Sequence, residues 1–253
     1  MIEGVSPDLP HTDELPVTRE WGLRMARRPV AVLLRTWWQV SLHEAARVPA
    51  EGPVILAANH IGLLDGPVLV ALTRRLTFAL AKRELFVGIL GRLLAQVGQI
   101  SVDRRSLDTT AIDRAVQVLR SGRVLAVFPE GVRTDGSVAW ARGGAAYLAL
   151  VTGAPVVPVA LLGTREPGGG KNALPRRRRP VHVVYGEPMT IPQVPWPRRR
   201  AEVASWTEII RQRLAEHVVA AQALTGLPLP GPPARRAAAP GLISTSSPDT
   251  NVK

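Results

Sequence analysis

Cysteine is absent from this sequence of 253 residues, which excludes disulfide bonds, thiolate metal sites and a cysteine nucleophile. The Gly-x-Ser-x-Gly turn that presents the nucleophilic serine of α/β-hydrolases is absent as well. We expect no metal site, no cofactor and no covalent intermediate on the protein, and these absences are consistent with that expectation.

Lysine is rare: Lys82, Lys171 and Lys253 are the only lysines among 32 basic residues. The formal net charge of +12 indicates an anionic partner, which can be nucleic acid, an acidic membrane surface or a phosphorylated substrate. A genomic bias towards arginine produces the same balance. Aromatic residues make up only 4% of the chain and are not interleaved with arginines as base-stacking platforms would be, which argues against nucleic acid.

Signals for export or membrane insertion are also lacking. The first 15 residues are acidic and interrupted by prolines, so we expect no signal peptide. The longest uncharged run, 143–164, could span a bilayer by length alone, but Gly153, Pro155 and Pro158 interrupt it. We expect a buried helix, a turn and a core strand there, and no transmembrane helix.

Apolar runs alternate with helical patterns from residue 53 onward, which predicts an α/β fold with a largely parallel central sheet flanked by helices. The expected strands are 53–58, 76–81, 99–102, 123–128, 155–162 and 181–186. The expected helices are 66–73, 85–96, 106–121, 142–152 and 200–223. We predict an N-terminal arm with basic amphipathic helices over residues 1–46, a catalytic domain over 47–227 and a disordered tail over 228–253, which is rich in Pro, Ala, Ser and Thr.

The N-terminal segment from Arg19 to about Ala46 has a helical pattern, with a break expected before Pro29. Its apolar residues recur at helical spacing, and arginines and tryptophans are interspersed among them: Val30, Leu33, Leu34 and Trp37; Arg24, Arg27, Arg28 and Arg35; Trp21 and Trp38. This composition is typical of a helix lying in the headgroup layer of a membrane. The alternative is a helix packed on the core with solvated arginines.

A histidine and an aspartate mark the first candidate site. The apolar run Val54 to Ala58 predicts a buried strand that ends at His60, at the strand end where α/β sheets carry their chemistry. Asp65 follows five residues later, ahead of an apolar stretch that it could cap as a helix N-cap. The two side chains meet only if the chain turns between them, which Gly62 permits. A carboxylate on one imidazole nitrogen would leave the other free to take a proton from a hydroxyl. The alternative is a structural histidine beside an ordinary helix cap.

A second strand end carries Phe128-Pro129-Glu130-Gly131, followed by Arg133. Gly131 would allow a ligand close to the backbone and offer it an N–H, and Arg133 could bind a phosphate with two hydrogen bonds. We expect Glu130 to accept from a substrate hydroxyl or to hold an arginine. The alternative is a turn with a surface Glu–Arg pair. Arg104 follows another predicted strand, and a phosphate between Arg104 and Arg133 would bring an acceptor hydroxyl towards His60.

Four sequence blocks together resemble the glycerophosphate and lysophosphatidate acyltransferase family. Asn59-His60 with Asp65 is similar to the family's His-x4-Asp motif, and the second block, residues 98–104, ends in an arginine. Residues 128–134 resemble Phe-Pro-Glu-Gly-Thr-Arg-Ser, and residues 156–159 resemble a short apolar strand carrying a proline. The resemblance extends from about Arg47 to Pro188. Ser101 and Val132 depart from the family pattern, but neither removes a charged group.

The resemblance implies that the protein moves a fatty acyl group from an acyl thioester, on coenzyme A or acyl carrier protein, to the free hydroxyl of 1-acyl-glycerol 3-phosphate. The product would be phosphatidic acid, a step of phospholipid biosynthesis. His60 and Asp65 would be catalytic, and the expected substrate-binding residues are Asn59, Arg104, Glu130, Gly131 and Arg133. We expect a peripheral protein at an anionic membrane surface, on the cytoplasmic face, with no nucleic-acid partner.

Other functions stay open at this point. Within the family, the acceptor could be glycerol 3-phosphate, another lysophospholipid or an amino-acid-containing lipid. A lipid hydrolase would release thiol or fatty acid without an acceptor. A non-catalytic basic membrane-binding protein would release neither.

Overall fold

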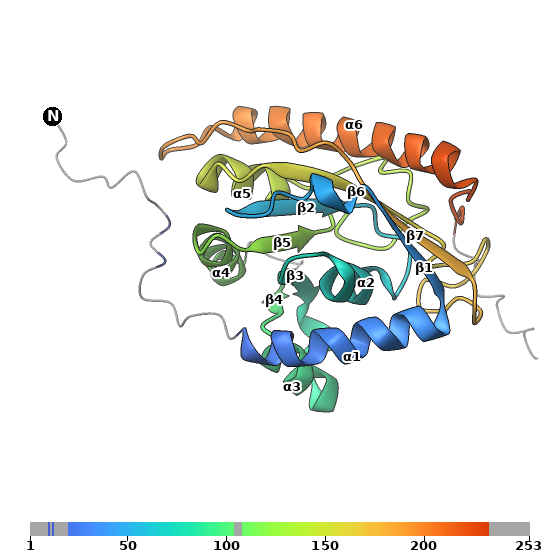
Figure 1. Cartoon of the computed structure of the whole chain (residues 1–253). Helices are drawn as coiled ribbons and strands as arrows, with labels where there is room; N and C mark the ends of the chain where they lie inside the picture. Colours follow the sequence, from blue (N-terminus) through green and yellow to red (C-terminus); the bar gives the residue numbers. More distant parts are fainter. Residues whose placement is uncertain (1–9, 11, 13–19, 104–107, 233–253) are drawn as a thin grey trace, which may run out of the picture.

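A seven-stranded sheet forms the centre of the computed structural model, which describes residues 10, 12, 20–103 and 108–232 (Figure 1). The spatial order is β1-β7-β6-β2-β5-β3-β4. All neighbouring strands are parallel except β6 and β7, so β1 and β7 run opposite to the other five. The strands are β1 (Gln39–His43), β2 (Val54–Ala58), β3 (Thr77–Lys82), β4 (Ile100–Val102), β5 (Val124–Val127), β6 (Val156–Leu162) and β7 (Pro180–Tyr185). The predicted α/β class with a largely parallel sheet is confirmed.

Helices cover both faces of the sheet, which is why β2, β5 and β6 consist of apolar residues and proline that are buried throughout. One face packs against α4 (Thr109–Arg120), α5 (Gly144–Thr152) and α6 (Arg200–Thr225). The other packs against α2 (Asp65–Leu72) and the C-terminal part of α1 (Trp21–Trp37). The remaining helix, α3 (Gly88–Gln96), lies beside α1 at the bottom of Figure 1. Every strand and helix expected after residue 52 is present, with ends shifted by up to three residues.

The helix expected to continue to Ala46 is wrong beyond Trp37. Residues 39–43 form the edge strand β1, which pairs in parallel with β7. Trp38 is already extended, and the Gln39 N–H donates to the Arg179 carbonyl at 3.1 Å. Pairing with a distant strand therefore overrides the local helical pattern.

The break expected before Pro29 is also wrong, because α1 continues through this residue. Proline removes one backbone donor from the helix. Pro29 lies on the exposed side of α1, where water can satisfy the carbonyl that loses its partner.

The central strands bring distant segments together at one edge of the sheet. Ala57 of β2 is paired with Val127 of β5, and Ala58 is paired with Val159 of β6. The residues that follow these three parallel strands therefore meet at their carboxyl ends, where α/β sheets bind ligands. Predictions for the N-terminal arm up to residue 19, for Arg104 and for the tail beyond residue 232 lie outside the described residues.

Candidate active site

His60 and Asp65 meet as the sequence predicts. His60 Nδ1 and Asp65 Oδ2 are 2.8 Å apart, and the imidazole is nearly buried. The turn between them depends on Gly62, because a Cβ there would lie 2.4 Å from the Thr164 carbonyl oxygen. Asp65 is the first residue of α2 and not its N-cap, which is Leu64. That part of the prediction is wrong, because the carboxylate turns back towards the preceding loop.

The Asp65 carboxylate is fully buried and is held by four donors. Oδ2 accepts from His60 Nδ1 and from the backbone N–H groups of Ile61 and Gly62, at 2.7 and 2.8 Å. Oδ1 accepts from the Thr164 hydroxyl, which follows β6. These bonds compensate for the loss of water and fix the orientation of the carboxylate.

Two contacts fix the orientation of the His60 imidazole, one at its edge and one at its face. Asp65 accepts from Nδ1–H, so Nε2 carries the ring's free lone pair. The ring stacks on Phe128, with centroids 4.2 Å apart and an interplanar angle of 24°. Within the described part of the chain, Nε2 has no hydrogen-bond partner. The arrangement can accept a proton at Nε2 while Asp65 stabilises the resulting imidazolium.

Glu130 joins the two motifs through the backbone. Its Oε2 accepts from the His60 N–H at 2.7 Å, and its Oε1 accepts from the Thr134 hydroxyl. The Thr134 N–H in turn donates to the His60 carbonyl at 2.8 Å. Burial raises the pKa of Glu130 to about 6, a rise opposed by its two hydrogen bonds. Among the described residues Glu130 has these two partners and no arginine; it holds the His60 segment in place.

Gly131 has a backbone conformation that favours glycine, with φ of +69°. Its N–H donates to the Phe128 carbonyl at 2.9 Å and is therefore engaged in the turn, contrary to the N–H expected to face a ligand. A Cβ at this position would lie 2.9 Å from Arg142 Nε. A larger residue at position 131 would thus displace the Arg142 side chain.

Arg133 connects the site with the loop that follows β6. Its Nη1 donates to Asn172 Oδ1 at 2.5 Å and to the Lys171 carbonyl at 3.3 Å. Its Nε is buried and has no hydrogen-bond partner among the described residues. Burial lowers the pKa of Arg133, and the charge of Asp65 opposes that shift. Its Nη2 likewise forms no hydrogen bond among the described residues and is not buried, so the guanidinium can offer donors to an anion.

Of the other two predicted binding residues, the structure describes Asn59 but not Arg104. Asn59 is fully buried, and its amide clamps β6: Nδ2 donates to the Leu161 carbonyl at 3.1 Å, and Oδ1 accepts from the Leu161 N–H at 2.7 Å. Asn59 thus holds two strand ends together and does not present its amide to a ligand. Arg104 lies outside the described residues.

Thr164, Thr134 and Asn172 are polar partners of the site that the sequence analysis did not identify. Thr164 contacts Asp65 from 99 positions away, which no local pattern reveals. Its place directly after the carboxyl end of a buried strand is the signal that could have identified it. Among the described residues, no group of three or more His, Asp or Glu side chains could hold a metal ion.

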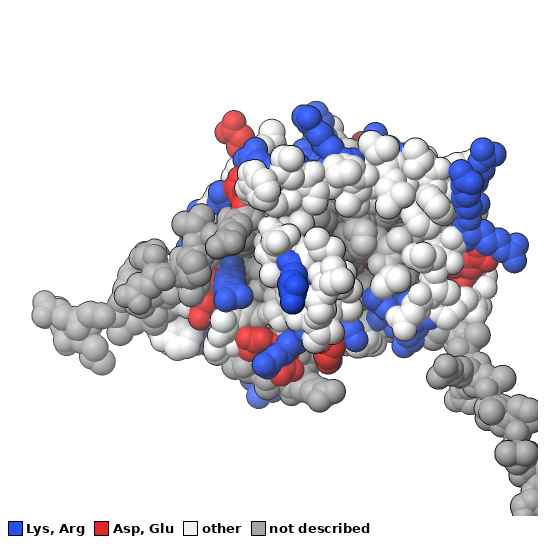
Figure 2. Space-filling model, turned by 90° about the horizontal axis from the view of Figure 1, so that it is seen from below, with Lys and Arg blue, Asp and Glu red and all other residues white. Residues whose placement is uncertain are grey.

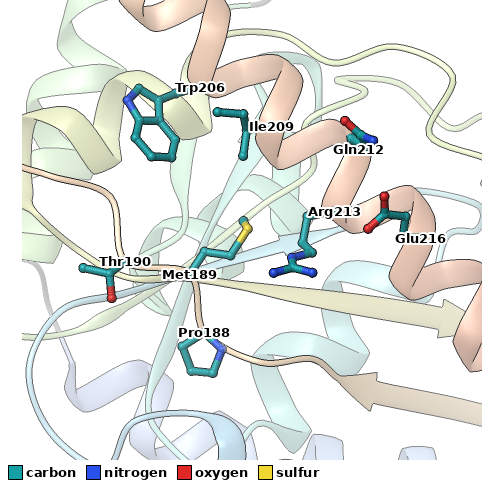
Figure 3. Close-up of a pocket in the computed structure, with 8 residues that line it drawn as sticks. All are labelled: Pro188, Met189, Thr190, Trp206, Ile209, Gln212, Arg213 and Glu216. Carbon is teal, nitrogen blue, oxygen red and sulfur yellow. The ribbon is translucent and has the colours of Figure 1, made fainter.

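A cavity of about 490 Å³ lies between α6 and residues 188–190 (Figure 3). Trp206, Ile209 and Arg213 project from α6 towards Met189. Met189 pairs with Val156, the first residue of β6, whereas Thr164 follows the last. The seven residues of β6 extend about 20 Å, so this cavity lies at the other edge of the sheet from His60.

Comparisons with known proteins agree on one family. Residues 39–162 match the family model described as Acyltransferase, which includes both His60 and Asp65. The chain is 28% identical over 187 residues to a 1-acyl-sn-glycerol-3-phosphate acyltransferase of Bacillus subtilis, covering 73% of this chain and 91% of that protein. It is 36% identical over 148 residues to a lyso-ornithine lipid O-acyltransferase of Pseudomonas aeruginosa, covering 54% of this chain and 57% of that protein.

The fold has a counterpart among solved structures. The crystal structure of the 1-acyl-sn-glycerophosphate (LPA) acyltransferase PlsC from Thermotoga maritima superposes with a TM-score of 0.57 at 22% identity, covering 78% of this chain and 80% of that one. At this identity the likeness concerns the fold alone. The matched domain and the named relatives lead to one conclusion about the family. The chain belongs to the glycerophosphate and lysophosphatidate acyltransferase family of O-acyltransferases.

Proposed function

We propose that the protein transfers a fatty acyl group from an acyl thioester to the free hydroxyl of 1-acyl-glycerol 3-phosphate, which yields phosphatidic acid. The observation that carries this proposal is the buried His60–Asp65 pair, whose Nε2 has no partner among the described residues, with Arg133 close enough for its charge to interact with Asp65. The name of the Bacillus subtilis relative supports the choice of acceptor.

In the proposed reaction His60 is the general base. Nε2 takes the proton from the acceptor hydroxyl as its oxygen attacks the thioester carbonyl carbon. The C–S bond of the tetrahedral intermediate then breaks, and the leaving thiolate takes the proton from the imidazolium. The products are an ester and a free thiol, and the protein returns to its starting state. Asp65 keeps the imidazole in the required tautomer and stabilises its charge, and base catalysis of this kind contributes about 10²–10⁴-fold.

Arg133 is the proposed ligand of the acceptor phosphate. Only Nη1 of its guanidinium has partners among the described residues, which supports this role because a phosphate oxygen could accept from the remaining donors. The half-buried guanidinium also interacts more strongly with an anion than an exposed one would. Arg104 is proposed as a second phosphate ligand from the family resemblance. Asn59, Glu130 and Gly131 support the site through hydrogen bonds to the backbone around it.

We propose that the protein works at the surface of an anionic membrane, on its cytoplasmic face, and binds no nucleic acid. No described helix is both long and apolar enough to cross a bilayer. Helix α1 exposes large apolar side chains, including Trp21, Met25, Val32 and Leu33, together with several arginines. This combination suits a helix lying at the interface. The acyl donor is coenzyme A or acyl carrier protein.

A second candidate is acylation of a different lysolipid, because the Pseudomonas relative is named for lyso-ornithine lipid. An acceptor without phosphate would not need the Arg133 donors that have no partner among the described residues, which is why we favour lysophosphatidate. Glycerol 3-phosphate is a third acceptor to be compared.

An acceptor panel tests the proposal. Thiol release by the purified chain is measured with palmitoyl-CoA, and separately with palmitoyl-acyl carrier protein, in the presence of lysophosphatidate, glycerol 3-phosphate or lyso-ornithine lipid. We expect release that requires lysophosphatidate. Faster release with another acceptor would reassign the substrate. Acceptor-independent release would indicate a hydrolase, and no release with either donor would indicate a binding protein.

A further inference from the structure

We infer that the groove between α1 and α2 is a binding site for the headgroup of an anionic phospholipid of the bilayer, separate from the catalytic site. The groove encloses about 690 Å³. One wall consists of arginines of α1, and the floor is the apolar C-terminal end of α2, with Ala71 and Leu72. Among the described residues, no acidic side chain lines it.

The arginines line the groove because of their spacing along α1. Arg24, Arg28 and Arg35 are four and eleven residues apart, which corresponds to about one and three helical turns on the same side of the helix. Arg24 is paired with Glu20 at 2.7 Å. Arg27, towards the core, donates to the carbonyls of Ala71 and Thr73, which attaches α1 to α2. These two guanidiniums therefore have structural partners.

Arg28 and Arg35 are different. Both are exposed, and neither forms an ion pair or hydrogen bond within the described part of the chain. Seven residues of helix place them about 10 Å apart along the groove. Each offers a planar set of donors that matches a phosphate oxygen pair. Two unpaired guanidiniums above an apolar floor are the chemistry of a site for a phosphate ester.

The apolar surroundings favour a lipid over a free anion. Next to the arginines, α1 exposes Trp21, Met25, Val32 and Leu33, with between 52% and 75% of each accessible. Helix α3 and the residue before it continue this face with exposed Val87, Ile89, Leu90 and Leu93. The two helices are in close contact, since a Cβ on Gly22 would lie 2.1 Å from the Gln96 carbonyl oxygen.

Figure 2 views the molecule from below, the side on which α1 and α3 lie in Figure 1, and shows basic side chains and a few acidic ones on a largely uncharged surface. A phospholipid would place its phosphate between Arg28 and Arg35, its glycerol on the apolar floor and its acyl chains along the neighbouring apolar face. Inorganic phosphate would gain only the first of these contacts.

The groove and the catalytic site lie at opposite ends of the same helix. Asp65 begins α2, and Leu72 ends it, about 10 Å away along the axis. A bilayer lipid bound at the C-terminal end would fix the height of the catalytic end above the membrane. This inference extends the proposed membrane partner to a particular headgroup site, and vesicle binding tests it independently of turnover.

The test compares the full chain with three double variants on extruded vesicles of phosphatidylcholine, with and without about 30% phosphatidylglycerol. Arg28→Gln with Arg35→Gln should weaken binding to the anionic vesicles about 30-fold, because each basic residue near the surface contributes about 1 kcal/mol. The matched control is Arg200→Gln with Arg213→Gln, which removes two exposed charges from α6, across the sheet. It should stay within about threefold, because charges beyond a Debye length of about 10 Å are screened.

Arg28→Lys with Arg35→Lys distinguishes a site that depends on guanidinium geometry from attraction by positive charge alone. It keeps both charges and loses the planar donor sets, so binding should fall at least fivefold. Binding equal to that of the unmodified chain would overturn the headgroup site. Inorganic phosphate, added at constant ionic strength, should not displace the protein from vesicles; displacement at millimolar phosphate would assign the groove to a free anion. Equal losses in the Gln variant and the α6 control would also overturn the inference, and circular dichroism verifies that each variant is folded.

Discussion

Helix α2 has two contrasting ends. At its N-terminal end the Asp65 carboxylate is fully buried, and both of its oxygens have donors. At its C-terminal end, Arg28 and Arg35 of α1 stand exposed over a groove without partners among the described residues. The first environment gives fixed geometry, which proton transfer needs; the second gives unpaired charge, which attracts an anionic surface. Changes at the two ends should therefore affect different measurements.

The largest effect is expected from Asp65→Asn. The amide would favour the wrong tautomer of His60 and could not stabilise an imidazolium, so acceptor-dependent thiol release should fall about 10³–10⁴-fold. Steady-state kinetics with lysophosphatidate and an acyl thioester measures this. A loss below tenfold in a folded protein would contradict the role given to Asp65.

Arg133→Gln should act on the acceptor. Losing a charged donor to phosphate should lower kcat/KM for lysophosphatidate about 10–100-fold, mainly through KM. The same change should leave acylation of a phosphate-free acceptor, if detectable, within about threefold. Arg200→Gln serves as the control, since it removes one exposed arginine at the start of α6 that forms no part of the proposed site. Equal losses with both acceptors would show that Arg133 does not bind the phosphate.

Thr164→Val should weaken both activity and stability. It leaves a buried carboxylate oxygen of Asp65 without its donor, which costs about 1–3 kcal/mol in the free energy of unfolding. We expect thiol release to fall about tenfold. Thr164→Ser restores the hydroxyl and should recover most of both quantities. Failure of the serine variant to recover activity would mean that the threonine methyl group, and not the hydrogen bond, matters here.

Glu130 predicts a pH dependence of stability. Its folded-state pKa of about 6 lies above the ordinary value of 4.5 because of burial, so the fold favours the protonated form. The stabilising contribution is complete below about pH 4.5 and is lost as the pH rises through 6. Relative to Glu130→Gln, the unmodified chain should lose about 2 kcal/mol of unfolding free energy between pH 4 and pH 7.5. Urea denaturation of both proteins measures this difference, and a difference independent of pH would contradict the raised pKa.

The smallest effect on chemistry is expected at the other end of α2. Arg28→Gln with Arg35→Gln should change thiol release with monomeric, soluble substrates by less than twofold, although vesicle binding falls strongly. Assays below the critical micelle concentration of the lysolipid measure this. A large loss of thiol release under these conditions would show that the groove arginines also contribute to catalysis, which contradicts separate roles for the two ends of α2.

Much of this architecture follows from the sequence because the signals are local. The uninterrupted apolar runs of β2, β5 and β6 indicate buried parallel strands, and Gly62 between His60 and Asp65 permits the turn that brings them together. The edge strand β1 was not predictable in the same way, because its residues follow a helical pattern without a break. Only its pairing with β7 determines its conformation.

The supporting contacts of the site are less predictable, since they depend on which groups the fold brings together. Glu130 suggests a substrate contact in the sequence, but in the fold it faces the His60 N–H from a neighbouring strand end. Thr164 meets Asp65 only because β6 lies next to β2 in the sheet. The Asn59 amide likewise forms its two hydrogen bonds with the backbone of Leu161, on the neighbouring strand β6. Residue types and spacing identify His60 and Asp65 as the reacting pair, whereas the order of strands in the sheet determines which residues support this pair.

The most direct measurement is acceptor-dependent thiol release by His60→Ala beside the unmodified chain, with circular dichroism to confirm the fold. His43→Gln is the matched control, because His43 lies on the edge strand β1, three places from β2 in the sheet order, and its ring contacts His182. The account predicts a loss of at least 10²-fold for His60→Ala and less than twofold for His43→Gln. A folded His60→Ala protein that retains more than a tenth of the original rate would contradict the assignment of His60 as the base.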